Sequence, residues 1–230
     1  MRLWLLLTFG VAAAFASQTT ASVDTAAEPH HHLTLQNSYI RVFKVEVAPG
    51  DATLPHRHSH DYILVSMGPA KIATQDEGKA AVTIPAQDGQ VIFAEGNPAR
   101  VMRNLATTPF RSVAVEFMQD QNPSRSPEWD EERGLEVLEG GTKDILFVKD
   151  GVRVSEIDLQ PGGMIPRHHH AGPHLIVAVS ELDLRSDVAG KGVSNVMLHS
   201  GDAKWVVGGF THTLMNQAKQ PAKFITLEFH

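Results

Sequence analysis

The amino-acid sequence predicts an all-β protein made of two similar domains in tandem. The first observation is an internal repeat, because Ile40-Arg41-Val42 recurs as Val152-Arg153-Val154, an offset of 112 positions. The same offset relates Glu116-Phe117 to Glu228-Phe229, and no gap is needed between these segments. The second observation is that each copy consists of short β-branched runs bounded by turns, and the third is that no stretch inside a copy has a convincing helical period. A repeat that keeps its register over this distance indicates a duplicated domain.

The strands follow one another in the same order in both copies. Each copy opens with a β-branched strand that runs into a Pro-Gly turn, at Arg41 to Val47 and at Val152 to Leu159. The further expected strands are Ile63 to Ser66, Gln90 to Ala94 and Val113 to Phe117 in the first copy, and Leu175 to Ser180, Lys204 to Val207 and Phe224 to Phe229 in the second. Many short strands at even spacing predict a sandwich or a small barrel for each copy.

The remaining segments are expected to lie outside the two barrels, which are predicted over 33–118 and 144–230. Arg2, the apolar run that follows it and Ala14-Phe15-Ala16 predict a cleaved signal peptide over 1–16, so export to a periplasm or to the medium is expected. Residues 17–32, which include His30-His31-His32, are expected to form a flexible, solvated N-terminus. Residues 119–143 are polar and are expected to form a linker with one short helix near Trp129 to Leu138.

Composition excludes several classes of function. The formal net charge is −6 and no cluster of Lys and Arg stands out, so neither nucleic acid nor an anionic membrane surface is an expected partner. Apolar residues make up 42% of the chain, which is enough for packed cores. The chain contains no cysteine, which argues against iron–sulfur clusters and cysteine-bound zinc. A metal would have to be bound by His, carboxylate or water.

Four histidines of the second copy have spacings that suit a metal site. His168 and His170 are two residues apart, so in a strand both side chains point to the same face. A turn at Ala171-Gly172-Pro173 would return His174 to that face, and His212 would arrive from a separate hairpin. Four imidazole ligands predict a site for a single divalent transition metal, and the candidates are Fe, Mn, Ni, Cu and Zn.

These spacings resemble the two-part signature of the cupin superfamily. The matching residues of the second copy are Gly162, His168, His170, Gly201, Gly209, His212 and Asn216. The resemblance extends to both copies and implies two double-stranded β-helix (jelly-roll) barrels, with a metal inside each working copy. Two residues depart from the signature, since His174 stands where cupins usually have Glu and Val207 replaces Pro. Four neutral imidazoles would leave the ion near +2, which favours anionic oxygen ligands. If His174 turned away, a three-histidine site with three open positions would remain.

The first copy is predicted to carry a degenerate site. His56 and His58 persist, but Tyr62 stands at the third ligand position and Arg100 at the fourth. A guanidinium is a poor neighbour for a metal because it does not lose its charge. The favoured interpretation is a structural copy with an anion pocket around Arg100, and the alternative is a metal held with the help of His60.

Two classes of function remain open from the sequence. The first is a metal-dependent enzyme acting on a small organic substrate, with dioxygenase-like oxidoreductase chemistry preferred and non-redox lyase or isomerase chemistry next. The second is a non-catalytic cupin of the cell envelope that binds a ligand or a metal, since fold alone does not decide function. No general base falls at a motif position of the second copy. After removal of the leader no membrane insertion is expected, and either a monomer or a homodimer is compatible with the sequence.

Overall fold

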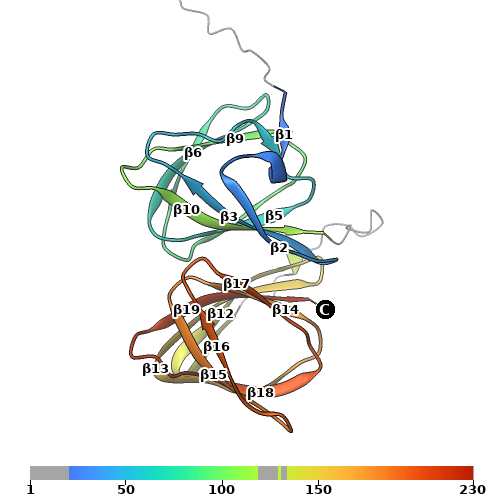
Figure 1. The fold of residues 1–230 in the computed structure, drawn as a ribbon, viewed down its shortest axis with the longest axis vertical. Coiled ribbons are helices and arrows are strands. Elements are labelled where there is room, and N and C mark those ends of the chain that lie inside the picture. Colours follow the sequence, from blue (N-terminus) through green and yellow to red (C-terminus); the bar gives the residue numbers. More distant parts are fainter. Residues whose placement is uncertain (1–20, 119–128, 131–133, 230) are drawn as a thin grey trace, which may run out of the picture.

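Two β-barrels lie end to end along the long axis of the molecule (Figure 1). The computed structural model describes residues 21–118, 129–130 and 134–229. The predicted signal peptide and the first part of the predicted linker lie outside these residues. Apart from one three-residue 3-10 helix, the secondary-structure elements of the described chain are all β-strands, which confirms the predicted fold class of two tandem cupin-type barrels.

The first barrel consists of two five-stranded sheets. Their strand orders are β1-β4-β9-β6-β7 and β2-β3-β10-β5-β8. The elements are β1 (Val23–Asp24), the short 3-10 helix η1 (Thr25–Ala27), β2 (His31–Gln36), β3 (Ile40–Val47), β4 (His56–Arg57), β5 (Tyr62–Ser66), β6 (Ala70–Asp76), β7 (Val82–Ala86), β8 (Val91–Ala94), β9 (Arg100–Asn104) and β10 (Phe110–Phe117).

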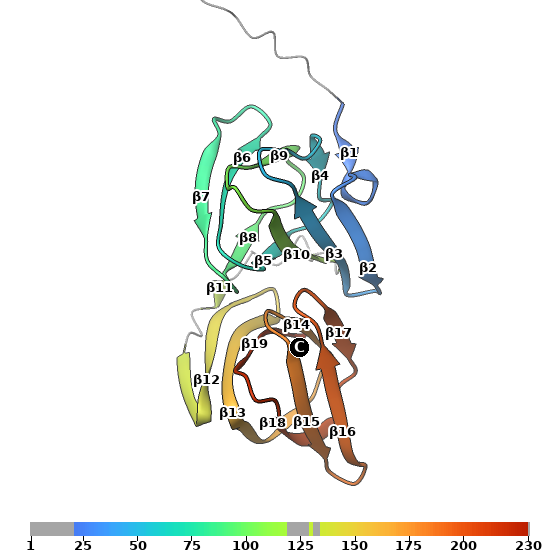
Figure 2. The same ribbon diagram turned by 60° about the vertical axis from the view of Figure 1, so that its left-hand side comes forward.

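The second barrel is one continuous nine-stranded sheet. Its main path is β16-β15-β18-β13-β19-β14-β17, and β12 joins it by pairing with β13 (Figure 2). The elements are β11 (Trp129–Asp130), β12 (Gly134–Lys149), β13 (Val152–His170), β14 (His174–Ala178), β15 (Leu182–Val188), β16 (Gly192–Leu198), β17 (Ala203–Val206), β18 (Phe210–Asn216) and β19 (Ala222–Phe229).

The register of the sheets repeats at the offset found in the sequence. Ile40 pairs with Phe117 in the first barrel, and Val152 pairs with Phe229 in the second. At the candidate site His56 pairs with Arg100, and the equivalent pair is His168 with His212. Arg100 and His212 therefore occupy the same position of two equivalent barrels.

A third hydrophobic core joins the barrels. Each barrel has an interior core of its own, and a further cluster of buried residues is drawn from β3, β5 and β10 of the first barrel and from β13, β14 and β19 of the second. On β14 the side chains of Leu175 and Val177 belong to this shared core, whereas Ile176 and Ala178 face the barrel interior. Strands buried on both faces carry unbroken apolar runs instead of alternating ones. This explains why Leu175 to Val179 is apolar throughout.

The prediction of a flexible segment over 17–32 is wrong for its described part. β1, η1 and β2 lie between residues 23 and 36, and Glu28 and His31 are both buried. β2 pairs with β3 and so belongs to the first barrel, which begins before residue 33. The sequence pattern was misleading because three consecutive histidines look hydrophilic, although strand alternation buries His31 and exposes His32.

The helix expected near Trp129 to Leu138 is also replaced by strand. β11 covers residues 129–130 and pairs with β12, which begins at Gly134 and runs along β13. The second barrel therefore begins before residue 144. Leu138 is buried in the core of this barrel, whereas Leu135 and Val137 are exposed on the strand. Residues 119–128 and 131–133 lie outside the described chain.

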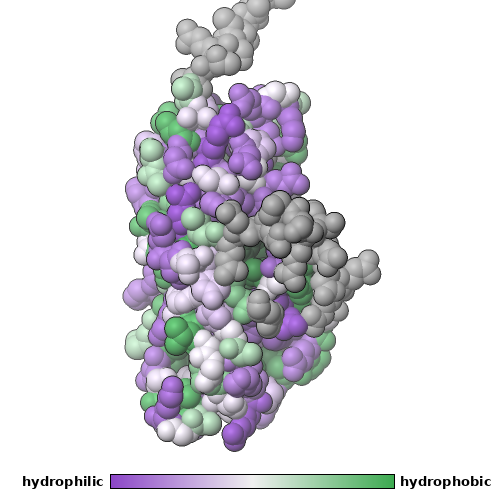
Figure 3. All heavy atoms as spheres, turned by 90° about the vertical axis from the view of Figure 1, so that its right-hand side faces the viewer, coloured by the Kyte–Doolittle hydropathy of each residue, from purple (hydrophilic) through white to green (hydrophobic). Residues whose placement is uncertain are grey.

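The surface of the molecule mixes residue types. On the face drawn in Figure 3, hydrophilic and hydrophobic residues are interspersed over both barrels. Within the described residues no helix has the length and apolar character needed to cross a membrane.

Candidate metal centre

Three histidine side chains of the second barrel converge on one point. Nε2 of His168 lies 3.0 Å from Nε2 of His170, and Nε2 of His212 lies 3.0 Å from the first and 3.2 Å from the second. His168 and His170 come from β13, where alternation places them on one face, and His212 comes from the paired strand β18.

These separations fit one face of an octahedral metal ion. With metal–nitrogen bonds of about 2.1 Å, donors at right angles lie about 3.0 Å apart, and donors at tetrahedral angles lie about 3.4 Å apart. The observed distances agree better with the first arrangement, in which three further positions stay open. Without an ion, the lone pairs of three neutral nitrogens would face one another at this distance. The donor set therefore suits a divalent transition metal.

The second ring nitrogen of each ligand, Nδ1, contacts a polar group of the protein. Nδ1 of His168 donates to the carbonyl of Pro166 at 2.8 Å, Nδ1 of His212 lies 2.7 Å from Oγ of Ser186, and Nδ1 of His170 lies 3.3 Å from a carboxylate oxygen of Glu228. The carbonyl and the carboxylate accept from a protonated Nδ1, which leaves Nε2 of His168 and His170 free for a metal, and such partners raise the basicity of the ring.

Burial favours the neutral form of two of these imidazoles, His168 and His212. Desolvation, followed by repulsion from His168 and His170, lowers the pKa of His212 to about 3. Desolvation also lowers the pKa of His168. Because a metal ligand must be unprotonated, these shifts prepare the site for a cation at neutral pH.

His174 is the predicted ligand that the structure does not bring into the cluster. Its ring stacks on His170 with centroids 4.0 Å apart and an interplanar angle of 19°, and it is not among the three ligand nitrogens that share one locus. Burial, with the neighbouring His170, lowers the pKa of His174 to about 4, so it stays neutral there. In this structure three histidines form the site, and His174 lines the cavity beside them.

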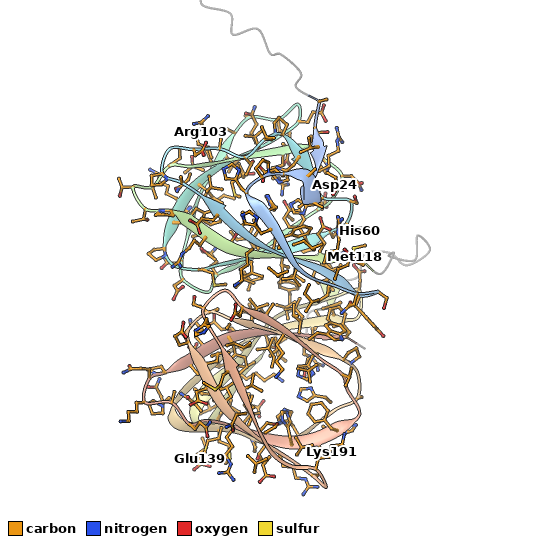
Figure 4. The ribbon with its side chains drawn as sticks, viewed as in Figure 1. Asp24, His60, Arg103, Met118, Glu139 and Lys191 are labelled. Carbon is orange, nitrogen blue, oxygen red and sulfur yellow. The ribbon has the colours of Figure 1, made fainter. Side chains whose placement is uncertain are left out.

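A cavity of about 500 Å³ opens onto the three nitrogens. Its apolar walls include Ile157, Ile176, Phe210 and Phe224. Its charged lining is mainly basic in a chain whose net charge is −6, and consists of Lys143, Arg153, Arg167, Lys191 and Lys204 together with Glu136 and Glu228. Lys191 lies at the end of the second barrel that is remote from the first (Figure 4). A cavity of this size admits a small organic molecule, and its charge favours an anion.

The predicted residues of the first barrel also lie together. His56 and His58 are buried, the ring of Tyr62 stacks on His58 at 3.7 Å, and Arg100 lies against Tyr62. Arg100 is bound by Asp76 at 2.6 Å, so the expected anion pocket is already filled by a carboxylate of the chain. His31 joins His56 and His58 in a second group of three potential ligands, and His60 is not a member of that group.

Sequence reasoning missed the residues that support the ligands. Arg41 pairs with Glu116 at 2.6 Å, and at the repeat-equivalent positions Arg153 pairs with Glu228 at 3.6 Å. The same two carboxylates also face Nδ1 of His58 and His170. The repeat offset carried a signal for this role, because Glu116 and Glu228 are related by the same shift as the histidines.

Comparisons with known proteins show which folds this chain resembles but do not identify its activity. Neither a protein-family model nor a curated protein sequence matches the chain. Among solved structures, oxalate decarboxylase from Bacillus subtilis matches with a TM-score of 0.61 and 12% identity over 84% of this chain and 68% of that one. AerE from Microcystis aeruginosa matches with a TM-score of 0.61 and 12% identity over 88% and 98%. A further structure of the Bacillus enzyme, described for its Mn(II) centres, has a TM-score of 0.62 at 12% identity over 87% and 76%. The chain is therefore similar to two-barrel cupins in fold.

Proposed function

We propose that the second barrel is the active site of a metal-dependent enzyme that acts on a small organic acid. The observation that carries this proposal is the facial set of three Nε2 atoms in the wall of a cavity whose charged lining is mainly basic. A bound transition metal would supply Lewis-acid or oxygen-activating chemistry there. Dioxygenase-like oxidoreductase chemistry is the reaction to test first, because three neutral donors leave open positions on the ion.

The residues of the chain have separate tasks in this proposal. His168, His170 and His212 hold the ion, and Ser186 and Glu228 keep two of these rings oriented. Lysine and arginine side chains of the cavity bind the carboxylate of the substrate by charge. Apolar walls exclude water from the reacting end, which strengthens these electrostatic contacts.

The main competing function is ligand binding without turnover. Of the two carboxylates that line the cavity, Glu228 is held by His170 and cations, and Glu136 lies exposed on β12. Neither is placed as a free general base. A non-redox lyase or isomerase would use the same metal, so only a reaction assay separates these candidates. Export of a monomer or homodimer to the periplasm or the medium remains part of the proposal.

The test combines metal content with an activity screen. The full chain, purified without a His tag, is compared with the double variant His168→Ala, His212→Ala after loading with Fe, Mn, Ni, Cu or Zn. We expect the variant to bind one metal equivalent less and to lose all turnover of small carboxylic acids. Oxygen consumption identifies dioxygenation, and product formation without oxygen identifies a lyase or isomerase. Equal metal content in both proteins contradicts the site, and metal loss without any turnover in the wild type favours the binding function.

A further inference from the structure

We propose that the first barrel holds a second, closed metal site, formed by His56, His58 and His31, with His31 supplied by the N-terminal strand β2. This site is distinct from the one that carries the proposed function and does not depend on it. His31 lies outside both segments that match the cupin signature, so no motif points to it.

The three imidazoles converge much as those of the second barrel do. One nitrogen from each ring lies within 4.8 Å of the others. The ring centroids of His31 and His56 are 4.6 Å apart, those of His56 and His58 are 5.3 Å apart, and those of His31 and His58 are 5.6 Å apart. In the second barrel the corresponding distances run from 4.4 to 5.1 Å. The first-barrel cluster is slightly wider but of the same kind.

Each ring is again held at Nδ1, which leaves Nε2 as the ligand atom. Nδ1 of His56 lies 2.9 Å from the carbonyl of Leu54, and Nδ1 of His58 lies 2.7 Å from Glu116. Leu54 and Glu116 are the repeat equivalents of Pro166 and Glu228. The match extends beyond the ligands to the groups that orient them, which an accidental cluster of histidines would not reproduce.

Glu28 is the group that contacts Nδ1 of His31 and orients its ring. Its side chain has no exposed surface, and one of its oxygens lies 2.6 Å from Nδ1 of His31. The backbone N–H groups of His30 and Leu54 also donate to this carboxylate. A buried carboxylate behind an imidazole is the arrangement that strengthens a histidine as a metal ligand.

The two barrels have exchanged the position of the third histidine. His31 pairs with Val45 on β3, and at the equivalent place Lys143 pairs with Ile157 on β13. In turn, Arg100 occupies the place of His212. In the first barrel the β2 position holds His31 and the β9 position holds Arg100. In the second barrel the equivalent β12 position holds Lys143 and the equivalent β18 position holds His212. The replacement of His212 by Arg100 removes one ligand, and the replacement of Lys143 by His31 restores it.

Arg100 does not prevent a cation from binding. Its guanidinium is bound by Asp76 at 2.6 Å and by the hydroxyl of Tyr62, so its charge is already balanced. The second carboxylate of the site, Glu116, is shared between Arg41 and His58.

The surroundings of this site point to a structural ion and not to a reaction. The three histidines are 2 to 5% exposed, and the cavity beside them has a volume of about 40 Å³. That space holds at most a few water molecules. The class of ligand is therefore a divalent transition metal such as Zn²⁺ or Co²⁺, bound without an organic substrate. Its effect would be to fix the N-terminal strand against the barrel.

The test isolates this site in the full chain that already carries His168→Ala and His212→Ala. After chelation and re-addition of Zn²⁺ or Co²⁺, we expect about one equivalent of metal per chain. Adding His31→Ala should abolish this binding, and adding His32→Ala, the exposed neighbour, should leave it unchanged. Glu28→Gln should weaken it 10–100-fold. Absence of metal from the parent double variant, or equal affinity in the His31→Ala and His32→Ala proteins, would overturn the proposal.

A second measurement on the unmodified chain remains informative if His31→Ala does not fold. Hydrogen exchange of residues 23–36 is compared in the metal-loaded and the chelated protein. We expect slower exchange in β2 when metal is bound, with no comparable change in β7 on the other sheet. Equal exchange of β2 in both states contradicts the proposal. Failure of the activity screen would leave both measurements unaffected.

Discussion

Glu228 lies 3.3 Å from Nδ1 of His170, on the side of the ring opposite to the cluster of Nε2 atoms. The same carboxylate faces Arg153 at 3.6 Å and Lys143 at 3.9 Å. Burial alone would raise its pKa, but the contact with His170 and the nearby cations outweigh burial and lower the pKa of Glu228 to about 2. Glu228 therefore stays ionised at neutral pH and serves as an orienting group for a ligand.

Removing this charge should weaken metal binding. Glu228→Gln keeps the size of the side chain but loses the carboxylate that supports His170, so we expect a 10–100-fold loss of metal affinity in the second barrel. Glu181→Gln is the matched control, since Glu181 is exposed and pairs with His199 away from the cavity. Competition with a chromophoric chelator measures both affinities. An unchanged affinity in Glu228→Gln would mean that the ring is oriented by packing alone.

Acid should destabilise the metal-free protein at a pH where carboxylates are still ionised. The pKa of His212 is lowered from 6.5 to about 3 and that of His56 from 6.5 to about 4, chiefly by burial. Below pH 6.5 these histidines therefore bind protons in the unfolded chain but not in the folded chain. The stability that depends on these neutral rings is complete well above pH 6.5 and is lost as the pH falls from 6.5 toward the folded-state pKa values, about 4 for His56 and about 3 for His212.

Thermal unfolding of the chelated protein between pH 8 and pH 4.5 measures this effect. We expect a nearly constant Tm above pH 7 and a falling Tm below pH 6.5, with a shallower fall in His212→Asn. His199→Asn is the control, because His199 is exposed and its ion pair with Glu181 raises its pKa, which has the opposite sign. A flat Tm from pH 7 to pH 4.5 would rule out buried neutral histidines.

The repeat made much of the fold and half of the candidate chemistry predictable. His168, His170 and His212 could be found because strand alternation and a fixed offset place them on one face. His31 could not, because its role depends on β2 pairing with β3, a contact that local sequence does not encode. The strand at Gly134–Lys149 was missed for a similar reason, since its first part is exposed and only pairing with β13 keeps it extended.

The buried amide of Asn216 should be essential for the stability of the second barrel. Its side-chain nitrogen donates to the carbonyls of Leu159 at 3.1 Å and Gln220 at 2.8 Å, and its oxygen accepts from the N–H of Ala218. Asn216→Ala leaves these buried groups unpaired, at a cost of about 1–3 kcal/mol for each one that water does not reach. We expect urea unfolding to show a loss of about 2–4 kcal/mol. Asn195→Ala, at an exposed position of β16, should change stability by less than about 0.5 kcal/mol.

The basic lining of the cavity should control the affinity for anions. Lys204→Gln removes one exposed charge from the cavity lining, so we expect about 2–5-fold weaker binding of a small dicarboxylate to the metal-loaded protein. The difference from wild type should shrink as salt rises, because exposed charges are screened. Lys219→Gln, which changes the net charge equally but lies outside the cavity, is the control. Equal effects of both substitutions in calorimetric titrations would show that only overall charge matters.

The shared core between the barrels should make the whole chain unfold as one unit. Phe229 at the end of β19 contacts Tyr39 of the first barrel, with ring centroids 5.5 Å apart, and Trp205 of the second at 5.3 Å. Truncation of a buried phenylalanine typically costs about 3–5 kcal/mol, and here the loss falls on both barrels because the cavity lies between them.

Phe229→Ala should therefore lower the stability of both barrels while keeping a single transition. Hydrogen exchange can follow this barrel by barrel, with β3 and β13 as reporters that lie on opposite sides of the shared core. The control is Phe224→Ala, whose side chain is buried inside the second barrel alone. Because the chain is expected to unfold as one unit, we expect this substitution also to speed exchange in β13 and in β3 by the same factor. Independent unfolding of the two barrels in the wild-type protein would contradict a cooperative core, and each barrel would then have to be stable by itself.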